Sequence, residues 1–172
     1  MRSVCLLCAA WFVAAPVAAA PVVGVFASEH DDYERFGAHV RLDPVWARQW
    51  GHWQAALHPE FELSRFQYSG GVRSVPRQLD QAGAIALLRA VHGDGQWRPY
   101  AEFGIGLAHF SRTELGGKEF STSLQFSEHL GMGIEIGSQL SVGWRYSHHS
   151  NGDTVLPNNG IDMHQLVVDL RF

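Results

Sequence analysis

The chain has 172 residues, of which 46% are hydrophobic, and its formal net charge is −4. This acidic balance gives no reason to expect nucleic acid as a partner. After the amino-terminal region, no stretch reaches the roughly 20 consecutive apolar residues that a membrane helix requires, so the composition excludes a helical membrane protein.

Residues 1–20 have the three regions of a secretory signal peptide: a basic start, an apolar run and small residues before the cleavage point. We expect cleavage after Ala19 or Ala20, which leaves residues 21–172 as one mature domain. Both cysteines lie inside the signal peptide, so the mature domain is expected to contain none.

Beyond the signal peptide, apolar residues alternate with polar or small ones, which is the two-residue period of β-strands. In chain order the alternating segments cover residues 23–27, 36–42, 53–63, 82–91, 100–108, 123–136, 139–150 and 162–172. The fourth segment, AGAIALLRAV, could also form a short helix. Pro59 interrupts the third segment and predicts a bulge or a local bend there. Taken as strands, the segments number eight, the smallest usual count for an outer-membrane barrel.

The connections support this count. Short turns of glycine and polar residues follow His92 and occupy Gly137-Ser138, whereas the longer polar stretches 69–81, 112–122 and 151–160 fall at the other strand ends. Short turns on one side and long loops on the other are typical of such barrels. The sequence therefore predicts an all-β, eight-stranded antiparallel outer-membrane β-barrel, with the long loops facing outward from the bacterial outer membrane.

A soluble, lipocalin-like barrel in the periplasm is the alternative, and it would turn the apolar faces inward. Glycine pairs such as Gly104/Gly106 and Gly131/Gly133 lie on the polar faces. Such small residues suit a crowded interior better than a solvent face, and this favours the membrane barrel.

The last two segments carry candidate catalytic residues at their ends. Counting by twos from the apolar residues of 139–150 reaches His148 and Ser150, and counting back along 162–172 reaches Asp162. A serine hydroxyl becomes a nucleophile when a neutral imidazole takes its proton, and a carboxylate orients that imidazole. The pattern predicts a Ser150, His148 and Asp162 triad at the extracellular end, projecting into the lipid.

Glu128 is a rival for the acid. If the turn at Gly137-Ser138 sets a regular pairing, Glu128 lies across from His148 on the same apolar face. From the residues alone, both carboxylates remain candidates.

Other polar residues are assigned by the same alternation. Arg145 is predicted to face the interior, where Glu102 or Glu135 could pair with it. We expect no metal site from His148, His149 and His164, because the chain offers neither thiols nor a fixed ligand spacing. The predicted chemistry requires no cofactor.

The run RYSHHSNG at residues 145–152, followed by PNNGID at 157–162, resembles the lipid A 3-O-deacylases of Gram-negative outer membranes, called PagL. The motif itself covers only this part, while length, signal peptide and strand count are similar over the whole chain. The resemblance implies an outer-membrane esterase that removes the acyl chain at position 3 of lipid A, and its histidine and serine match His148 and Ser150.

The family's acid is commonly glutamate, and this chain has Asp162, which is one methylene shorter. Asn151 and Asn158 match asparagines of the motif and could support the loop or the oxyanion. The implied partner is lipid A, or lipopolysaccharide, in the outer leaflet of the membrane. The sequence leaves open whether the protein forms a homodimer.

Two other function classes remain. One is a non-enzymatic small outer-membrane barrel, either an adhesin or a structural protein, and the other is a lipid A acyltransferase. The first predicts no dependence on Ser150, and the second shares the nucleophile but passes the acyl chain to an acceptor other than water.

Overall fold

The structure is a computed structural model that describes residues 21–172, so the predicted signal peptide lies outside the described residues. The strands are β1 (Val22–His30), β2 (Tyr33–Arg41), β3 (Trp46–Trp50), β4 (Trp53–Tyr68), β5 (Gln78–His92), β6 (Trp97–Phe110), β7 (Glu114–Leu115), β8 (Lys118–Glu119), β9 (Leu124–Ile136), β10 (Leu140–Ser150) and β11 (Ile161–Arg171). No helix in this part of the chain has the length and hydropathy to cross a membrane.

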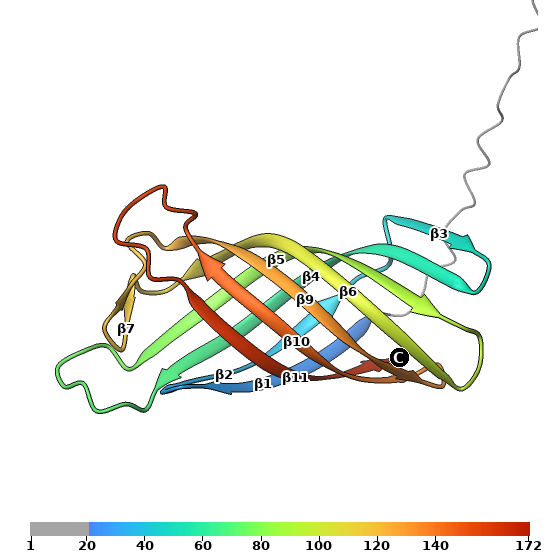
Figure 1. The fold of residues 1–172 in the computed structure, drawn as a ribbon, viewed down its shortest axis with the longest axis horizontal. Coiled ribbons are helices and arrows are strands. Elements are labelled where there is room, and N and C mark those ends of the chain that lie inside the picture. The colour runs from blue at the N-terminus through green and yellow to red at the C-terminus, as the bar shows by residue number, and fades with distance from the viewer. Residues whose placement is uncertain (1–20) are drawn as a thin grey trace, which may run out of the picture.

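Eight of these strands close into a barrel (Figure 1). Each neighbouring pair is antiparallel in the order β2, β1, β11, β10, β9, β6, β5, β4, and pairing of β4 with β2 completes the ring. The predicted all-β, eight-stranded barrel is confirmed. The ambiguous segment 82–91 is a strand within β5, because it pairs along its length with β4 on one side and β6 on the other.

Three short strands were not expected from the sequence. β3 pairs with the first part of β4 and forms a hairpin beside the barrel end that holds the C-terminus (Figure 1). Residues 43–52, to which the sequence pattern assigned no strand, therefore contain one. β7 and β8 form a separate hairpin at the opposite end, within the connection between β6 and β9.

Of the bulge or local bend predicted at Pro59, the structure excludes the bulge. The register between β4 and β5 runs without interruption from Trp53–His92 to Gln67–Gln78. Pro59 lies just beyond the last β2 pairing, Arg41 with Glu60, and its carbonyl accepts the Leu42 amide. Its missing N–H therefore falls where β4 leaves β2, so no ladder hydrogen bond is lost.

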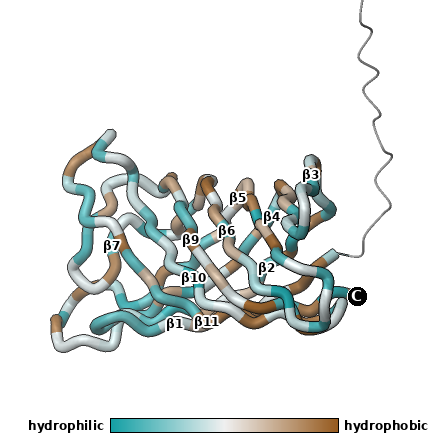
Figure 2. Tube along the Cα trace, turned by 45° about the vertical axis from the view of Figure 1, so that its right-hand side comes forward, coloured by the Kyte–Doolittle hydropathy of each residue, from teal (hydrophilic) through white to brown (hydrophobic). Residues whose placement is uncertain are grey.

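The apolar faces of the strands point outward. Val25, Leu63, Phe103 and Leu130 are each at least half exposed, at 57, 68, 52 and 55%, and they come from different strands around the ring. Hydrophilic residues gather on the loops at the end that carries β7 (Figure 2). An outward apolar band suits a lipid environment, so the lipocalin-like interpretation is wrong for this chain.

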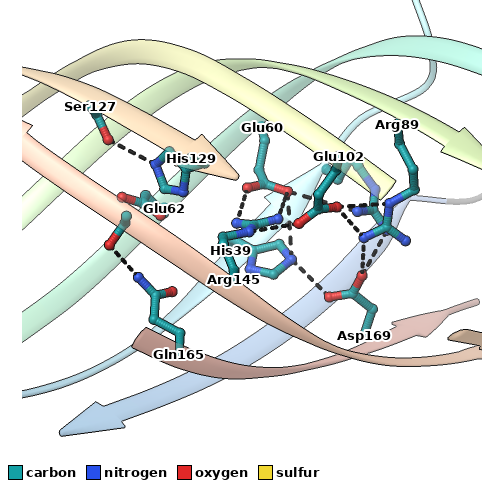
Figure 3. A network of polar contacts seen from close by, with 12 residues as sticks. His39, Glu60, Glu62, Arg89, Glu102, Ser127, His129, Arg145, Gln165 and Asp169 are labelled. Atoms are coloured by element: carbon teal, nitrogen blue, oxygen red, sulfur yellow. Dashed lines mark hydrogen bonds and ion pairs between the residues drawn. The ribbon is translucent and has the colours of Figure 1, made fainter. Parts of the chain in front are cut away.

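Charged side chains fill the middle of the lumen (Figure 3). Arg145 donates to Glu60 and to Glu102, with nitrogen–oxygen distances of 2.7 and 2.8 Å, and Arg89 links Glu102 to Asp169 at 2.7 and 3.2 Å. Arg145 faces the interior as predicted. It pairs with Glu102 but not with Glu135, which instead accepts from Arg98 at 2.8 Å.

The end of the lumen that carries β7 and β8 is closed by an apolar cluster rather than by charges. The buried members come from four barrel strands and from the hairpin connection: Phe66, Tyr68, Leu79, Ala108, Phe110, Leu115, Phe120, Ile161 and Met163. Leu115 and Phe120 belong to the connection between β6 and β9, so this cluster anchors that connection inside the mouth of the barrel.

Candidate active site

The candidate residues lie where β10 and β11 reach loop 151–160. Their register places His148 directly opposite Asp162 on β11 and opposite Glu128 on β9. Ser147 and His149 are fully buried in the lumen, whereas His148 and Ser150 are partly exposed. His148 and Ser150 therefore share the outer, lipid-facing side of the wall, as the alternation predicts.

His148 is hydrogen-bonded to Asp162, one of its two candidate acids. Its Nδ1 lies 2.6 Å from Asp162 Oδ1, and the two side chains are 33 and 47% exposed. Among the contacts of residues 21–172, none joins His148 to Glu128, although Glu128 faces the same side. Asp162 reaches the imidazole despite its short side chain because directly opposed residues of antiparallel strands have Cβ atoms only about 5 Å apart.

Ser150 stands two residues beyond His148 on the same face, at the end of β10. With Nδ1 engaged by Asp162, Nε2 is the imidazole nitrogen that can take a proton. The contacts of residues 21–172 include no hydrogen bond between the Ser150 hydroxyl and His148. Catalytic hydrogen bonds are often long before substrate binds and tighten in the complex.

Gly160 is a site residue that the sequence reasoning missed. Its φ is +59°, and a Cβ built on it would lie 3.2 Å from His148 Cε1 and 3.7 Å from Ser150 Cβ. Gly160 thus lies close to both His148 and Ser150. The NNG sequence before Ile161 is a signal for a left-handed turn and could have indicated this position.

Asn151 and Asn158 are engaged inside the loop. The Asn151 amide nitrogen Nδ2 donates to the carbonyls of Phe120 and Val155, both at 2.8 Å, and its backbone N–H donates to Asn158 Oδ1 at 3.1 Å. Asn158 Nδ2 in turn donates to Asp153 at 3.0 Å. These contacts use both hydrogens of the Asn151 side chain, one within the loop and one on the connection between β6 and β9.

The connection between β6 and β9 supports the same loop from outside. Glu119 and Asn159 exchange two hydrogen bonds, of 2.8 and 3.0 Å, and the Ser121 hydroxyl donates to the Pro157 carbonyl at 2.6 Å. The sequence reasoning gave residues 112–122 no role. Gly116-Gly117, both with positive φ between the paired Leu115 and Lys118, is a hairpin signal that could have revealed β7 and β8.

Glu62, His129 and His149 form the group, within residues 21–172, whose ligand atoms lie close enough to hold a metal ion, within 4.8 Å of one another. The Ser127 hydroxyl contacts His129 Nε2 at 2.8 Å (Figure 3) and His149 Nε2 at 3.2 Å. Arg35 donates to Glu62 at 2.7 Å, and its positive charge opposes a further cation beside that carboxylate. The group lies in the lumen, across the barrel wall from His148.

The three histidines considered in the sequence do not converge. His149 points into the lumen, while His148 and His164 face outward. His164 packs instead against Tyr146 and Trp144, with ring centroids 5.4 and 5.7 Å apart.

Known proteins resemble this chain over most of its length. The family model described as "Lipid A 3-O-deacylase (PagL)" matches residues 34–171, which include every residue of the candidate site. The chain belongs to the PagL family. The lipid A deacylase PagL of Bordetella bronchiseptica is 35% identical over 144 residues, which is 83% of this chain and 78% of that protein.

Two further members show the same relationship. The lipid A deacylase PagL of Pseudomonas aeruginosa is 39% identical over 69 residues, 40% of each chain. A crystal structure of the outer membrane enzyme PagL superimposes with a TM-score of 0.76 at 20% identity, covering 88% of this chain and 99% of that one. The barrel described above is therefore the PagL fold.

Proposed function

We propose that this PagL family member hydrolyses the ester that links the 3-O-acyl chain to lipid A in the outer leaflet of the outer membrane. Family membership makes the protein an outer-membrane ester hydrolase. The observation that carries the mechanism is the 2.6 Å contact between His148 Nδ1 and Asp162, on the lipid-facing side of the wall beside Ser150.

The first half of the reaction forms an acyl-enzyme. His148 Nε2 takes the proton of Ser150 as Oγ bonds to the ester carbonyl carbon, and the carbonyl oxygen becomes an oxyanion. The carbon–oxygen bond to the sugar then breaks, and the imidazolium returns the proton to the sugar oxygen. Asp162 holds the imidazole tautomer and stabilises the imidazolium that forms in between.

The second half uses water in place of the serine. His148 accepts a proton from a water molecule as the water oxygen attacks the acyl carbon. The bond between the acyl carbon and Ser150 Oγ then breaks, and Oγ takes the proton from His148. The products are a free fatty acid and lipid A with a free 3-hydroxyl. Protein side chains and water supply every atom and proton of this scheme, so it includes no metal or cofactor.

The outward direction of the site selects the substrate class. His148, Ser150 and Asp162 lie on the side of the wall that carries the apolar band, next to Phe126 and Leu130 on β9. An ester dissolved in water would have to leave its solvent to reach this surface, whereas a glycolipid of the surrounding leaflet already lies against it.

The test is the mass spectrum of lipid A from cells that produce the wild-type protein or the Ser150→Ala variant. The wild-type protein should remove one acyl chain, and the variant should leave lipid A intact, a loss of at least about 1,000-fold in rate. Ser147→Ala is the matched control, because Ser147 belongs to the same motif but faces the lumen.

Each alternative function predicts a different spectrum. A gain of one acyl chain with the wild-type protein would indicate an acyltransferase, and an unchanged spectrum would indicate a structural barrel or adhesin. Deacylation by the Ser150→Ala protein would remove Ser150 from the mechanism.

A further inference from the structure

One oxygen of Asp162 accepts two hydrogen bonds. Besides His148 Nδ1, the Tyr146 hydroxyl lies 2.6 Å from the same Oδ1 atom. Tyr146 is two residues before His148 on β10 and therefore shares its outward face. The catalytic scheme above gives this hydroxyl no role.

The second hydrogen bond matters because packing does not hold Asp162. Its side chain is 47% exposed at the end of β11, so the carboxylate can rotate about its short stem. A carboxylate orients an imidazole only when its accepting oxygen stays in line with Nδ1–H. A phenol that donates to that same oxygen restricts the carboxylate to the orientation that His148 requires.

Tyr146 is itself held by a row of rings on the barrel exterior. Its ring packs against His164 across the strand pair, at 5.4 Å, and His164 stacks on Trp144 with 20° between the ring planes. His30 also contacts His164 in a T-shaped arrangement, with ring centroids 5.4 Å apart. These contacts fix the ring, so the position of the hydroxyl follows from packing and not from substrate.

We propose that Tyr146 is a positioning residue for ester hydrolysis, which acts through Asp162 to hold the His148 imidazole in its productive orientation. This inference rests on the proposed function and deepens it. It differs from a role of Tyr146 in binding the acyl chain, because a binding role changes substrate affinity and needs no carboxylate at position 162.

A double-mutant cycle separates the two roles. Tyr146→Phe removes one oxygen atom and leaves the ring stack in place, so the folded barrel should be retained. With purified lipid A in detergent micelles, we expect kcat to fall about 10- to 150-fold, the range for losing a hydrogen bond to a charged group, with apparent KM unchanged. In the Asp162→Asn background the same substitution should change kcat less than about twofold, because the carboxylate it acts on is gone.

Tyr100→Phe is the control, since Tyr100 lies on β6 with its ring over Arg89 in the lumen, away from the site. An equal loss from Tyr146→Phe in both backgrounds, an effect confined to KM, or no effect at all would overturn the positioning role. The Asp162→Asn single variant reports separately on the proposed function. Its wild-type turnover would show that the acid was wrongly assigned, whereas an additive cycle on a strongly slowed but still measurable Asp162→Asn protein would refute only the role of Tyr146.

Discussion

At the scale of single residues, the site depends on which carboxylate faces the imidazole and on a glycine that leaves room for it. Asp162 contacts His148 at 2.6 Å, while Glu128 lies on the other neighbouring strand without such a contact among residues 21–172. Gly160 lies close to both His148 and Ser150. Each feature can be tested with a pair of substitutions, one expected to lower activity and a matched control expected to leave it nearly unchanged.

Asp162→Asn and Glu128→Gln form a matched pair that removes one charge from either side of His148. We expect Asp162→Asn to lower kcat by about 100- to 10,000-fold, because an amide favours the wrong imidazole tautomer and cannot stabilise the imidazolium. Glu128→Gln should stay within about twofold of wild type. Single-turnover deacylation of lipid A checks both, and the reverse ranking would make Glu128 the acid.

Gly160→Ala should lower activity at least about tenfold while the barrel remains folded. The new methyl group would lie 3.2 Å from His148 Cε1, and a left-handed backbone costs a non-glycine residue about 1–2 kcal/mol. Gly137→Ala is the control, because φ there is +63° and nothing lies within 4 Å of the added Cβ. Rates and heat-dependent gel mobility should be compared, and equal activity of the two variants would contradict a role for Gly160 in shaping the site.

At the scale of elements, the catalytic strands end in a loop that other segments hold. Loop 151–160 is bonded to the connection between β6 and β9 through Asn151, Asn159 and Pro157. That connection is in turn anchored by Leu115 and Phe120 in the apolar cluster at the barrel mouth. The geometry around Ser150 therefore depends on segments that contribute no catalytic group.

Phe120→Ala tests this support. Phe120 is fully buried and packs edge-on against Phe110, with centroids 5.2 Å apart, and its carbonyl accepts from Asn151. Removing the ring should loosen loop 151–160, accelerate its amide hydrogen exchange and lower kcat by about 10-fold, while the barrel strands stay protected. Val72→Ala, an exposed change in loop 69–77, should have no such effect; identical exchange in the two variants would argue against the coupling.

At the scale of the whole molecule, the barrel is inverted relative to a soluble protein: charges fill the lumen and apolar residues face lipid. Glu102 accepts from both Arg145 and Arg89 inside this lumen. The ion pairs that stabilise the barrel lie on the inner face of the wall, and the candidate catalytic residues lie on its outer face. This arrangement predicts that stability and activity can be changed separately.

Glu102→Gln should destabilise the barrel without changing chemistry at the site. Taking one partner from a buried ion pair leaves an uncompensated charge and costs about 3–5 kcal/mol. Denaturant unfolding in lipid vesicles measures the loss, and Glu34→Gln on the exposed face of β2 is the control. A large fall in kcat of the folded Glu102→Gln protein would contradict the view that the inner face determines stability and the outer face determines activity.

Much of this architecture was predictable because a β-strand alternates with a period of two, and a barrel wall converts that period into inside and outside. The alternation alone placed Arg145 and His149 in the lumen, and His148, Ser150 and Asp162 on the outer face. It also favoured strand over helix for most of the chain, and left 82–91 ambiguous because alanine and leucine suit either.

Tertiary structure decided everything that depends on two distant segments meeting. Alternation gives the face of a residue but not its partner. The contact of His148 with Asp162, the second hydrogen bond that Asp162 accepts from Tyr146, and the Glu60 partner of Arg145 all depend on the barrel register. The support of loop 151–160 by β7 and β8 followed from packing at the barrel mouth. The sequence determined which side of the wall carries the chemistry, and closure of the barrel determined which groups meet there, because strand pairing fixes distances that a one-dimensional period does not contain.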